Sequence, residues 1–250
     1  MIPTVTMRRA IRRVAEGVHR PPLVEASDGH QYVLKLGNRD ADFPACELIA
    51  AQVAPAFQVE VPPFALVQVP EPLRLGLSLM GEDWQDLAAI QRGGLCFGSR
   101  WLTGGPQKWR PEMGRSGAHE DARWRLFAFD LYIENCDRKA GDNPNLLLVG
   151  DRVVAIDHGD ALPCVMGVRD QLPYTHDTHL SWPLVQTRRD HLQVCSRWLT
   201  GGVTDQLIDT AVSSVPSPWW AGPERPALVR HGLRARRTAA ADIMTRLSQT

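Results

Sequence analysis

Oxygen-bearing side chains gather in the segment 130–159, in an order that suggests catalysis. Asp137 comes first, Asn143 and Asn145 follow, and Asp157 ends the series. Carboxylate and amide oxygens suit a hard cation such as Mg²⁺, which completes its shell with water and phosphate oxygens. An aspartate that accepts a hydroxyl proton would complete a site for phosphoryl transfer. Because Asp, Asn and Gly are also ordinary turn residues, the surrounding elements must decide between chemistry and a plain loop.

A predicted β-hairpin brings these side chains together. The ranges 145–149 and 152–156 are predicted strands, joined by a two-residue turn at 150–151. In that register Asp157 falls opposite Pro144, and the two asparagines flank this position. Opposite residues of an antiparallel pair have Cβ atoms roughly 5 Å apart, so one carboxylate and one or two amide oxygens converge. The pattern leaves open which asparagine would bind a metal.

A lysine and a glutamate nearer the N-terminus fit the same chemistry. In the predicted strand 32–36, Lys35 is a lone cation among apolar residues. Glu47 lies early in a predicted helix, 42–54, for which Asp42 is the expected N-cap. A strand lysine paired with a helix glutamate holds the α and β phosphates in protein-kinase-like folds. The order Lys, Glu, catalytic Asp, Asn and metal-binding Asp is reproduced along this chain.

The predicted elements divide the chain into two parts. Residues 1–70 are strand-rich with one helix, and Pro70-Glu71-Pro72 is the expected hinge. Residues 71–250 are mainly helical, with helices expected over 120–133 and 226–247. We therefore predict an α+β, two-lobed protein-kinase-like fold, with a small strand-rich N-lobe and a larger helical C-lobe.

Short motifs spread over residues 10–165 occur in combination. They are Gly17-Val-His-Arg-Pro21, Asp28-Gly29, Tyr32-Val-Leu-Lys-Leu36, Glu47, Phe97-Gly-Ser-Arg100, Asn135-Cys-Asp-Arg138, Asn143-Pro-Asn-Leu-Leu147 and Ile156-Asp-His-Gly159. This set resembles the HipA-like kinases, a compact bacterial branch of the protein-kinase-like fold that shares features with phosphatidylinositol 3/4-kinases. The combination is specific, although no single motif is.

The resemblance implies an activity and a catalytic centre. It implies an ATP- and Mg²⁺-dependent kinase that transfers the γ-phosphoryl group of ATP to a Ser or Thr hydroxyl of a protein. Asp137 would be the catalytic base, and Asp157 would replace the aspartate of the Asp-Phe-Gly motif as a metal ligand. Related catalytic loops place the metal-binding asparagine five residues after the base, a position that Asp142 holds here. Asn143 and Asn145 therefore both stay candidates.

The resemblance also implies how the nucleotide is held. Lys35 would contact the phosphates of ATP and pair with Glu47. Gly17, His19 and Arg20 would stand where the phosphate-covering loop lies. This loop contains a single glycine, so its backbone contacts to phosphate would be fewer than those of a glycine-rich clamp.

Two alternatives to an active kinase follow from these residues. The lengthened catalytic loop and the glycine-poor phosphate loop favour a catalytically weak or inactive kinase-fold module that binds nucleotide or a partner protein. A metal-dependent hydrolase using Asp137, Asp157 and His158 is the other interpretation. It would leave Lys35 and Glu47 without a role.

The composition limits the classes of partner and the cellular compartment that we expect. Lys and Arg total 28 and equal the 28 Asp and Glu, so no direct nucleic-acid binding is indicated. The 5 cysteines lie far apart without a Cys-x-x-Cys pair, which argues against a disulfide framework or a zinc site. No apolar run reaches bilayer-spanning length and no signal peptide is recognisable, so we expect a cytoplasmic protein without a membrane partner. HipA-like toxins phosphorylate aminoacyl-tRNA synthetases beside a small antitoxin, so the resemblance implies a protein substrate and a small cognate antitoxin-like partner.

Overall fold

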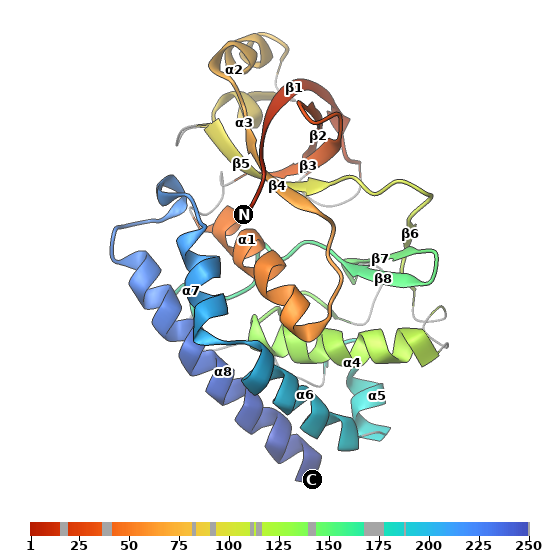
Figure 1. Cartoon of the computed structure of the whole chain (residues 1–250). Coiled ribbons are helices and arrows are strands. Elements are labelled where there is room, and N and C mark those ends of the chain that lie inside the picture. The colour runs from red at the N-terminus through yellow and green to blue at the C-terminus, as the bar shows by residue number, and fades with distance from the viewer. Residues whose placement is uncertain are drawn as a thin grey trace.

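The chain folds into a strand-rich part and a helical part (Figure 1). The computed structural model describes residues 1–15, 20–36, 42–81, 84–90, 94–110, 113, 117–139, 144–167, 178–187 and 189–249. The strands are β1 (Thr4–Arg13), β2 (Pro22–Ala26), β3 (Gln31–Lys35), β4 (Phe64–Gln68), β5 (Leu95–Arg100), β6 (Gln107–Lys108), β7 (Leu146–Val149) and β8 (Arg152–Ala155). The helices are α1 (Phe43–Val53), η1 (Ala54–Phe57), α2 (Glu71–Ser78), α3 (Gln85–Ala88), α4 (Gly117–Tyr132), α5 (Trp182–Thr187), α6 (Asp190–Gly202), α7 (Asp205–Ser213), η6 (Ser217–Trp219) and α8 (Arg225–Gln249). This mixed content confirms the predicted α+β class.

Strands β1 to β5 form a closed barrel in the order β1-β2-β3-β5-β4. β1 pairs antiparallel with β2 and parallel with β4, which closes the ring. Alternation along β3 places Tyr32 and Leu34 in the barrel core and leaves Lys35 on the other face. Gly98 of β5 faces the inside, where a Cβ atom would come 2.5 Å from Cγ2 of Val67. Only glycine therefore lets these strands approach so closely.

The strand-rich part extends beyond the predicted boundary at residue 70. β5 pairs with both β3 and β4, and without it the barrel would not close. Pro70 is the N-cap of α2 and Pro72 lies in the first turn, so these prolines begin a helix instead of forming a hinge. Proline suits the first turn because its missing N–H is not needed there. The chain leaves the barrel after β5, and the interpretation of residues 1–70 as the whole N-lobe ends too early.

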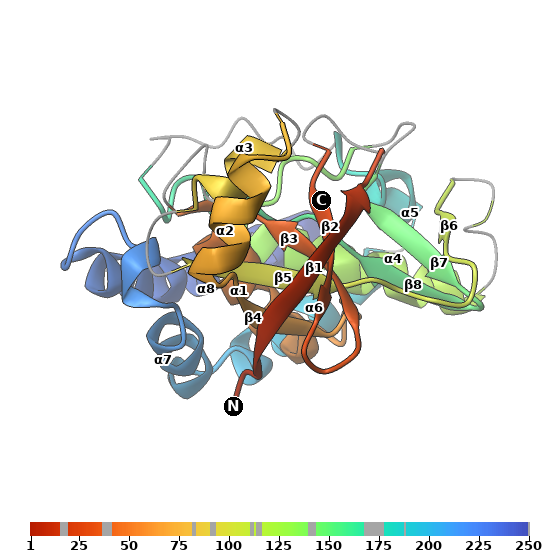
Figure 2. The same ribbon diagram turned by 90° about the horizontal axis from the view of Figure 1, so that it is seen from above.

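The helices α2 and α3, inserted between β4 and β5, cover one side of the barrel. Seen from above, they lie next to β3 and β5 (Figure 2). Leu77 of α2 and Leu87 of α3 belong to the barrel core. Arg13 at the end of β1 forms an ion pair with Asp86 of α3. The insertion therefore holds the end of β1, just before the segment predicted to cover the phosphates.

The helix α1 connects the barrel to the helical part. Its apolar residues share one core with α4, α6 and α8. Asp42 precedes the helix and makes no capping hydrogen bond with its side chain, and its Oδ2 accepts a hydrogen bond from Arg225 at 2.8 Å. A Cβ on Gly159 would overlap the ring of Phe43, so this glycine lets the helix dock against the loop after β8. The helix that carries Glu47 is thus anchored to the helical part.

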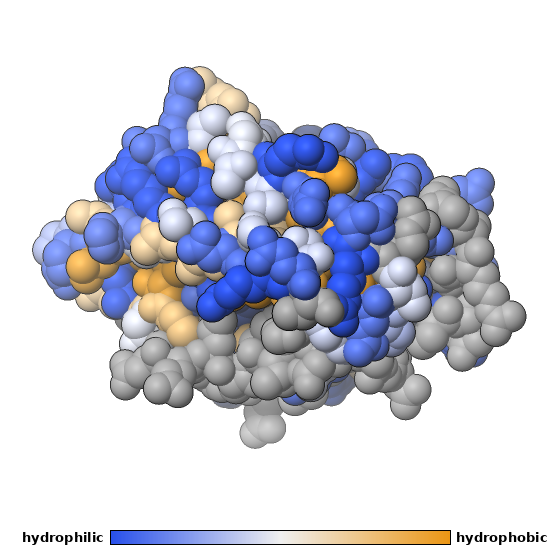
Figure 3. Space-filling view, turned by 90° about the horizontal axis from the view of Figure 1, so that it is seen from below, coloured by the Kyte–Doolittle hydropathy of each residue, from blue (hydrophilic) through white to orange (hydrophobic). Residues whose placement is uncertain are grey.

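The helical part has its own, larger core. Trp124 and Phe127 of α4, Leu199 of α6 and Leu233 of α8 are buried in it. The face seen from below is mostly hydrophilic over the described residues, with small apolar patches between (Figure 3). Within the part of the chain that the structure describes, we find no helix with the length and apolar character needed to cross a membrane.

Candidate active site

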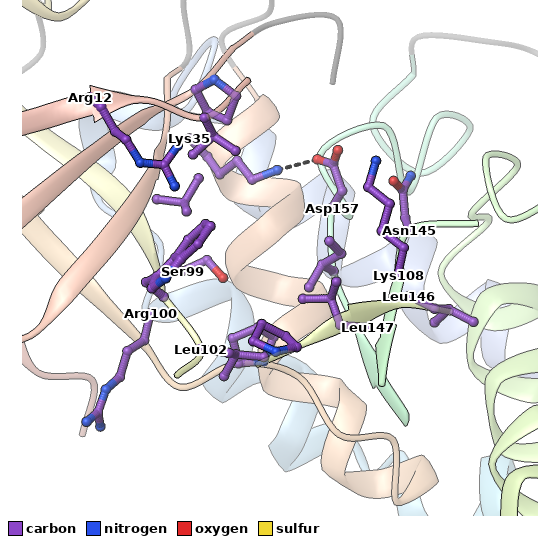
Figure 4. A pocket seen from close by; sticks show the side chains of 17 residues that line it. Arg12, Lys35, Ser99, Arg100, Leu102, Lys108, Asn145, Leu146, Leu147 and Asp157 are labelled. Atoms are coloured by element: carbon purple, nitrogen blue, oxygen red, sulfur yellow. Dashed lines mark hydrogen bonds and ion pairs between the residues drawn. The ribbon is translucent and has the colours of Figure 1, made fainter. Parts of the chain in front are cut away.

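A cavity of about 400 Å³ lies between the barrel and the β7–β8 hairpin (Figure 4). Val33 and Lys35 of β3 line it from the barrel side. Leu147 of β7, with Ile156 and Asp157 after β8, line it from the hairpin side. Pockets of this size hold small-molecule ligands, and an apolar slot with charged groups at one end suits a nucleotide.

The hairpin has the register that a turn at 150–151 predicts. Val149 pairs with Arg152, and the ladder continues outward to Leu146 and Ala155. Beyond it, the backbone N–H of Ile156 donates a hydrogen bond to the carbonyl of Asn145 at 3.0 Å. Asn145 and Asp157 therefore lie at the open end of the hairpin, next to the cavity.

Both of these residues have left-handed backbone conformations. The φ angle is 53° at Asn145 and 61° at Asp157. Asn and Asp tolerate this region better than other residues with a side chain. Such conformations concentrate at functional sites, because the surrounding contacts compensate their cost. The hairpin therefore aims an amide and a carboxylate at the cavity from strained positions.

Lys35 is held between two carboxylates. Its Nζ lies 3.1 Å from Oε1 of Glu47 on α1, and it also contacts Oδ1 of Asp157 (Figure 4). Burial disfavours the charged ammonium, but the two carboxylates outweigh it and hold the pKa of Lys35 above its ordinary value. Burial likewise opposes ionisation of Asp157, but Lys35 outweighs it and lowers the pKa of that carboxyl. The structure thus brings the three predicted residues into one charged cluster.

Asp137 lies in the loop after α4 and touches the hairpin. Nδ2 of Asn145 donates a hydrogen bond to Oδ2 of Asp137 at 2.6 Å. Partial burial raises the pKa of Asp137; the charges of Asp157 and Asp160 add to the rise, and the bond from Asn145 opposes it. The pKa values of Asp137 and Asp157 are therefore shifted in opposite directions. Such a split is typical of a proton acceptor beside a carboxylate that stays ionised.

A buried arginine fixes the loop of Asp137 against the hairpin. Arg138 donates from Nε to Oδ2 of Asp130 at 2.6 Å. One terminal nitrogen donates to the carbonyls of Pro144 at 3.0 Å and Asn145 at 2.7 Å. The other lies 3.1 Å from Nε2 of His158. Because Arg138 follows Asp137 directly and binds the residues that flank the hairpin opening, it sets the spacing of the site.

Asp130 of α4 is the common acceptor behind this arginine. Besides Arg138, it accepts from Nδ2 of Asn135 and from Nε2 of His179, both at 2.9 Å. Burial opposes its ionisation, but Arg138 and His179 outweigh burial and lower the pKa of Asp130. Asn135 in turn accepts a hydrogen bond from the backbone N–H of Asp137 at 3.1 Å. Through Asn135, the buried carboxylate of Asp130 therefore also orients the exposed carboxylate of Asp137.

His158 serves this network as a neutral acceptor. Burial, followed by the charge of Arg138, lowers its pKa to about 3. Since arginine can only donate, Nε2 of His158 must accept, and the ring proton sits on Nδ1, 3.8 Å from Oε2 of Glu47. A nitrogen occupied in this way is no base for a hydrolase, which removes the main support for that interpretation.

The remaining predicted residues are Asn143 and three residues of the predicted phosphate loop. Gly17, His19 and Asn143 lie outside the described residues. Arg20 is exposed, with φ of 42°, and its carbonyl accepts a hydrogen bond from Arg13 at 3.2 Å. In this region of the described chain, Arg12, Val14 and Pro21 line the cavity. The predicted role of the loop in covering phosphate stays a prediction.

Sequence reasoning missed several residues of the site. Arg12 and Trp101 line the cavity, with the Arg12 guanidinium carbon 5.3 Å from the ring centre. Lys108 of β6 lines it as well. No local motif marks these positions, because each reaches the cavity only through the pairing of distant strands. Arg138 had a signal: it stands inside the Asn-Cys-Asp-Arg motif, next to the proposed base.

The donor groups at the hairpin opening fit Mg²⁺. Asp157 keeps 46% of its side chain exposed, and Asp137 and Asn145 stand beside it. Within the described ranges, no group of three or more His, Cys, Asp and Glu could hold a metal ion. Mg²⁺ needs only one or two protein carboxylates when substrate phosphates supply the other oxygens. Of the described residues, Asp157 and Asn145 would hold it, and Asn143, outside the described residues, stays a candidate.

Comparison with known proteins identifies relatives of this architecture. The family described as HipA-like kinase matches residues 7–240. The crystal structure of a Helicobacter pylori proinflammatory kinase, CtkA, superimposes with a TM-score of 0.61, covering 99% of this chain and 98% of that chain. The two share 10% sequence identity, so this likeness concerns the fold alone. No curated protein matches the chain.

Proposed function

Because this chain belongs to the HipA-like kinase family, we propose that it transfers the γ-phosphoryl group of ATP to a Ser or Thr hydroxyl of a protein. One observation carries the proposal. Asp157 lines the cavity, and Asp137 is hydrogen-bonded to Asn145 beside it. The pKa values of the two carboxyls are shifted in opposite directions, and Lys35 is paired to Glu47 next to Asp157. A proton acceptor, a metal-binding carboxylate and a phosphate-binding cation are the groups that phosphoryl transfer requires.

The proposed reaction assigns one task to each group. Asp137 accepts the proton of the substrate hydroxyl as its oxygen forms a bond to the γ-phosphorus. The bond from that phosphorus to the bridging oxygen breaks, and ADP leaves with the electron pair. Asp157 and Asn145 would hold Mg²⁺, which would neutralise charge on the phosphates. Lys35 then exchanges its contact with Asp157 for a phosphate oxygen and keeps Glu47 as its partner.

The apolar part of the cavity provides a place for the nucleobase. Val14 and Val33 line it from the barrel, and Leu147 and Ile156 line it from the hairpin. A flat base between these two apolar surfaces would direct its triphosphate toward Lys35 and Asp157. The order of apolar and charged groups along the cavity therefore supports ATP as the phosphoryl donor.

The test is a transfer assay with ATP labelled in the γ-phosphate, using a mixture of candidate proteins as acceptors. We expect the wild type to label protein and Asp137→Ala to lose labelling while keeping its thermal unfolding temperature. Full activity of Asp137→Ala would refute the assignment of the base. Calorimetry with ATP and Mg²⁺ separates the alternative, because binding without turnover on any acceptor would support an inactive nucleotide-binding module.

A small cognate antitoxin-like partner stays a prediction from the family resemblance, and a cytoplasmic location stays a prediction from the sequence. Co-expression with a candidate small antitoxin-like protein, followed by size-exclusion chromatography, would test the partner. A stable complex would support it, and separate elution of the two proteins would not.

A further inference from the structure

Lys108 is a cation in the cavity to which the reaction above assigns no role. It lies on β6 and is exposed, and it lines the same cavity as Lys35, Asn145 and Asp157. Among the described residues, its side-chain ammonium makes no hydrogen bond or ion pair. In Figure 4 its ammonium end points in the same direction as the amide of Asn145, toward the end of the cavity where Asp157 lies.

Strand pairing explains this direction. Lys108 is directly opposite Leu147 in the antiparallel β6–β7 pair, so both side chains share the face that lines the cavity. Asn145 precedes Leu147 by two residues and therefore lies diagonal to Lys108. Diagonal neighbours have Cβ atoms roughly 7–8 Å apart, which a lysine side chain can span. The ammonium of Lys108 can thus reach the space in front of Asn145 and Asp157.

The charges of the cavity suit an anion. The other cations nearby are engaged: Lys35 contacts Glu47 and Asp157, and Arg12 stacks on Trp101. Lys108 is left with its charge unbalanced by any described residue. An exposed lysine that lines a cavity without a carboxylate partner is well placed to meet a ligand phosphate, because its ammonium can donate three hydrogen bonds to such oxygens.

We propose that Lys108 binds the β- and γ-phosphates of the bound nucleoside triphosphate from the hairpin side, facing Lys35 on the barrel side. This inference rests on the proposed kinase function. It also accounts for the single glycine in the predicted phosphate loop, since a second side-chain cation would replace backbone N–H donors that such a loop does not supply. Lys108 is then a substrate-binding residue that neutralises charge on the transferred group.

The test compares nucleotides that differ in their phosphates. Isothermal calorimetry with ATP, ADP and adenosine, each with Mg²⁺, is run on the wild type, Lys108→Met and Lys108→Arg. We expect Lys108→Met to weaken ATP binding by about tenfold, as the loss of one charge-assisted contact implies. Adenosine should bind both proteins equally, and Lys108→Arg should recover most of the affinity for ATP.

Two control variants separate the loss of the Lys108 contact from a disturbance of β6 and from a change in overall charge. Gln107→Met changes the neighbouring exposed residue of β6, which does not line the described cavity, and Arg8→Met removes an exposed positive charge from β1. Both should keep the wild-type affinity for ATP. A loss in Arg8→Met as large as that in Lys108→Met would overturn the proposal in favour of a long-range charge effect.

Three further outcomes also test the proposed phosphate contact of Lys108. If Lys108→Met binds ATP as tightly as the wild type, Lys108 is a solvated surface lysine and this inference is wrong while the kinase function stands. Equal weakening for ATP and adenosine would place Lys108 at the nucleoside and overturn the phosphate contact. If the wild type binds no ATP, both this inference and the proposed function fail.

Discussion

Two groups of charged residues meet at the loop of Asp137, and they differ in exposure. The open cluster comprises Lys35, Asn145 and Asp157, which line the cavity, and Asp137, which is hydrogen-bonded to Asn145. The buried clamp, Asp130, Arg138, His158 and His179, lies behind it. In the clamp, the carboxylate of Asp130 accepts hydrogen bonds from the side chains of Asn135, Arg138 and His179. The open cluster holds carboxylates that keep access to solvent and therefore to ligands.

The difference teaches that reactive groups and positioning groups occupy separate layers. Exposed carboxylates can exchange a lysine or asparagine partner for metal and phosphate at little cost. A buried ion pair cannot lose one partner without leaving an uncompensated charge. Changes at the exposed carboxylates of Asp137 and Asp157 should therefore affect activity and leave stability nearly intact, whereas changes in the clamp should affect stability first.

The largest effect on activity is expected from a change at Asp137, the proposed base. Asp137→Asn should lower kcat by about 10²–10⁴-fold, since the loss of a general base typically costs this much. The unfolding free energy should change by less than about 1 kcal/mol, because the side chain is exposed. Transfer kinetics and urea unfolding measure the two quantities. A large loss of stability would show that the two layers are not separate.

The next effect concerns the clamp. Arg138→Met should destabilise the fold by about 3–5 kcal/mol, because it leaves the carboxylate of Asp130 buried without its cation. Urea unfolding would measure this against Arg152→Met, which removes an exposed partner of Glu60 and should cost no more than about 1 kcal/mol. Equal stability of the two variants would contradict the distinction between buried and exposed pairs.

A smaller effect is expected at Lys35, which borders both layers. Lys35→Met should cost about 1–3 kcal/mol at neutral pH, because Glu47 stays buried without its ion-pair partner. Lys35 lowers the pKa of Asp157, so that contribution is present above the ordinary aspartate pKa and is lost as pH falls through the lowered value. The stability difference from the wild type should therefore shrink below pH of about 4. A difference that stays constant from pH 7 to pH 3 would disprove this linkage.

The smallest effect is a shift in the pH dependence of the reaction. Because the pKa of Asp137 is raised, the acid limb of kcat/KM should lie above the range of an ordinary aspartate. Asp160→Asn removes one of the charges that raise this pKa, so the limb should move to lower pH. The control is Asp151→Asn at the far turn of the hairpin, which should leave the pH profile unchanged. A limb that moves upward in Asp160→Asn would reverse the inferred sign.

Part of the site follows from the sequence through local rules. The turn at 150–151 and the alternation of the flanking strands determine the hairpin register, and the register places Asp157 beside Asn145. Alternation along β3 also determines that Lys35 faces away from the barrel core. These predictions hold because pairing across a short turn and the period of two in a strand depend only on neighbouring residues.

Only the tertiary structure decided the rest. The position of β5 between β3 and β4 overturned the boundary at residue 70, because a strand's partners depend on contacts distant in sequence. The hydrogen bonds of Arg138 and the direction of Lys108 were likewise invisible, since each joins segments that meet only after folding. The sequence by itself determined which residues could do chemistry and their local order. The fold decided which of them are buried, which face the cavity and which charges they meet.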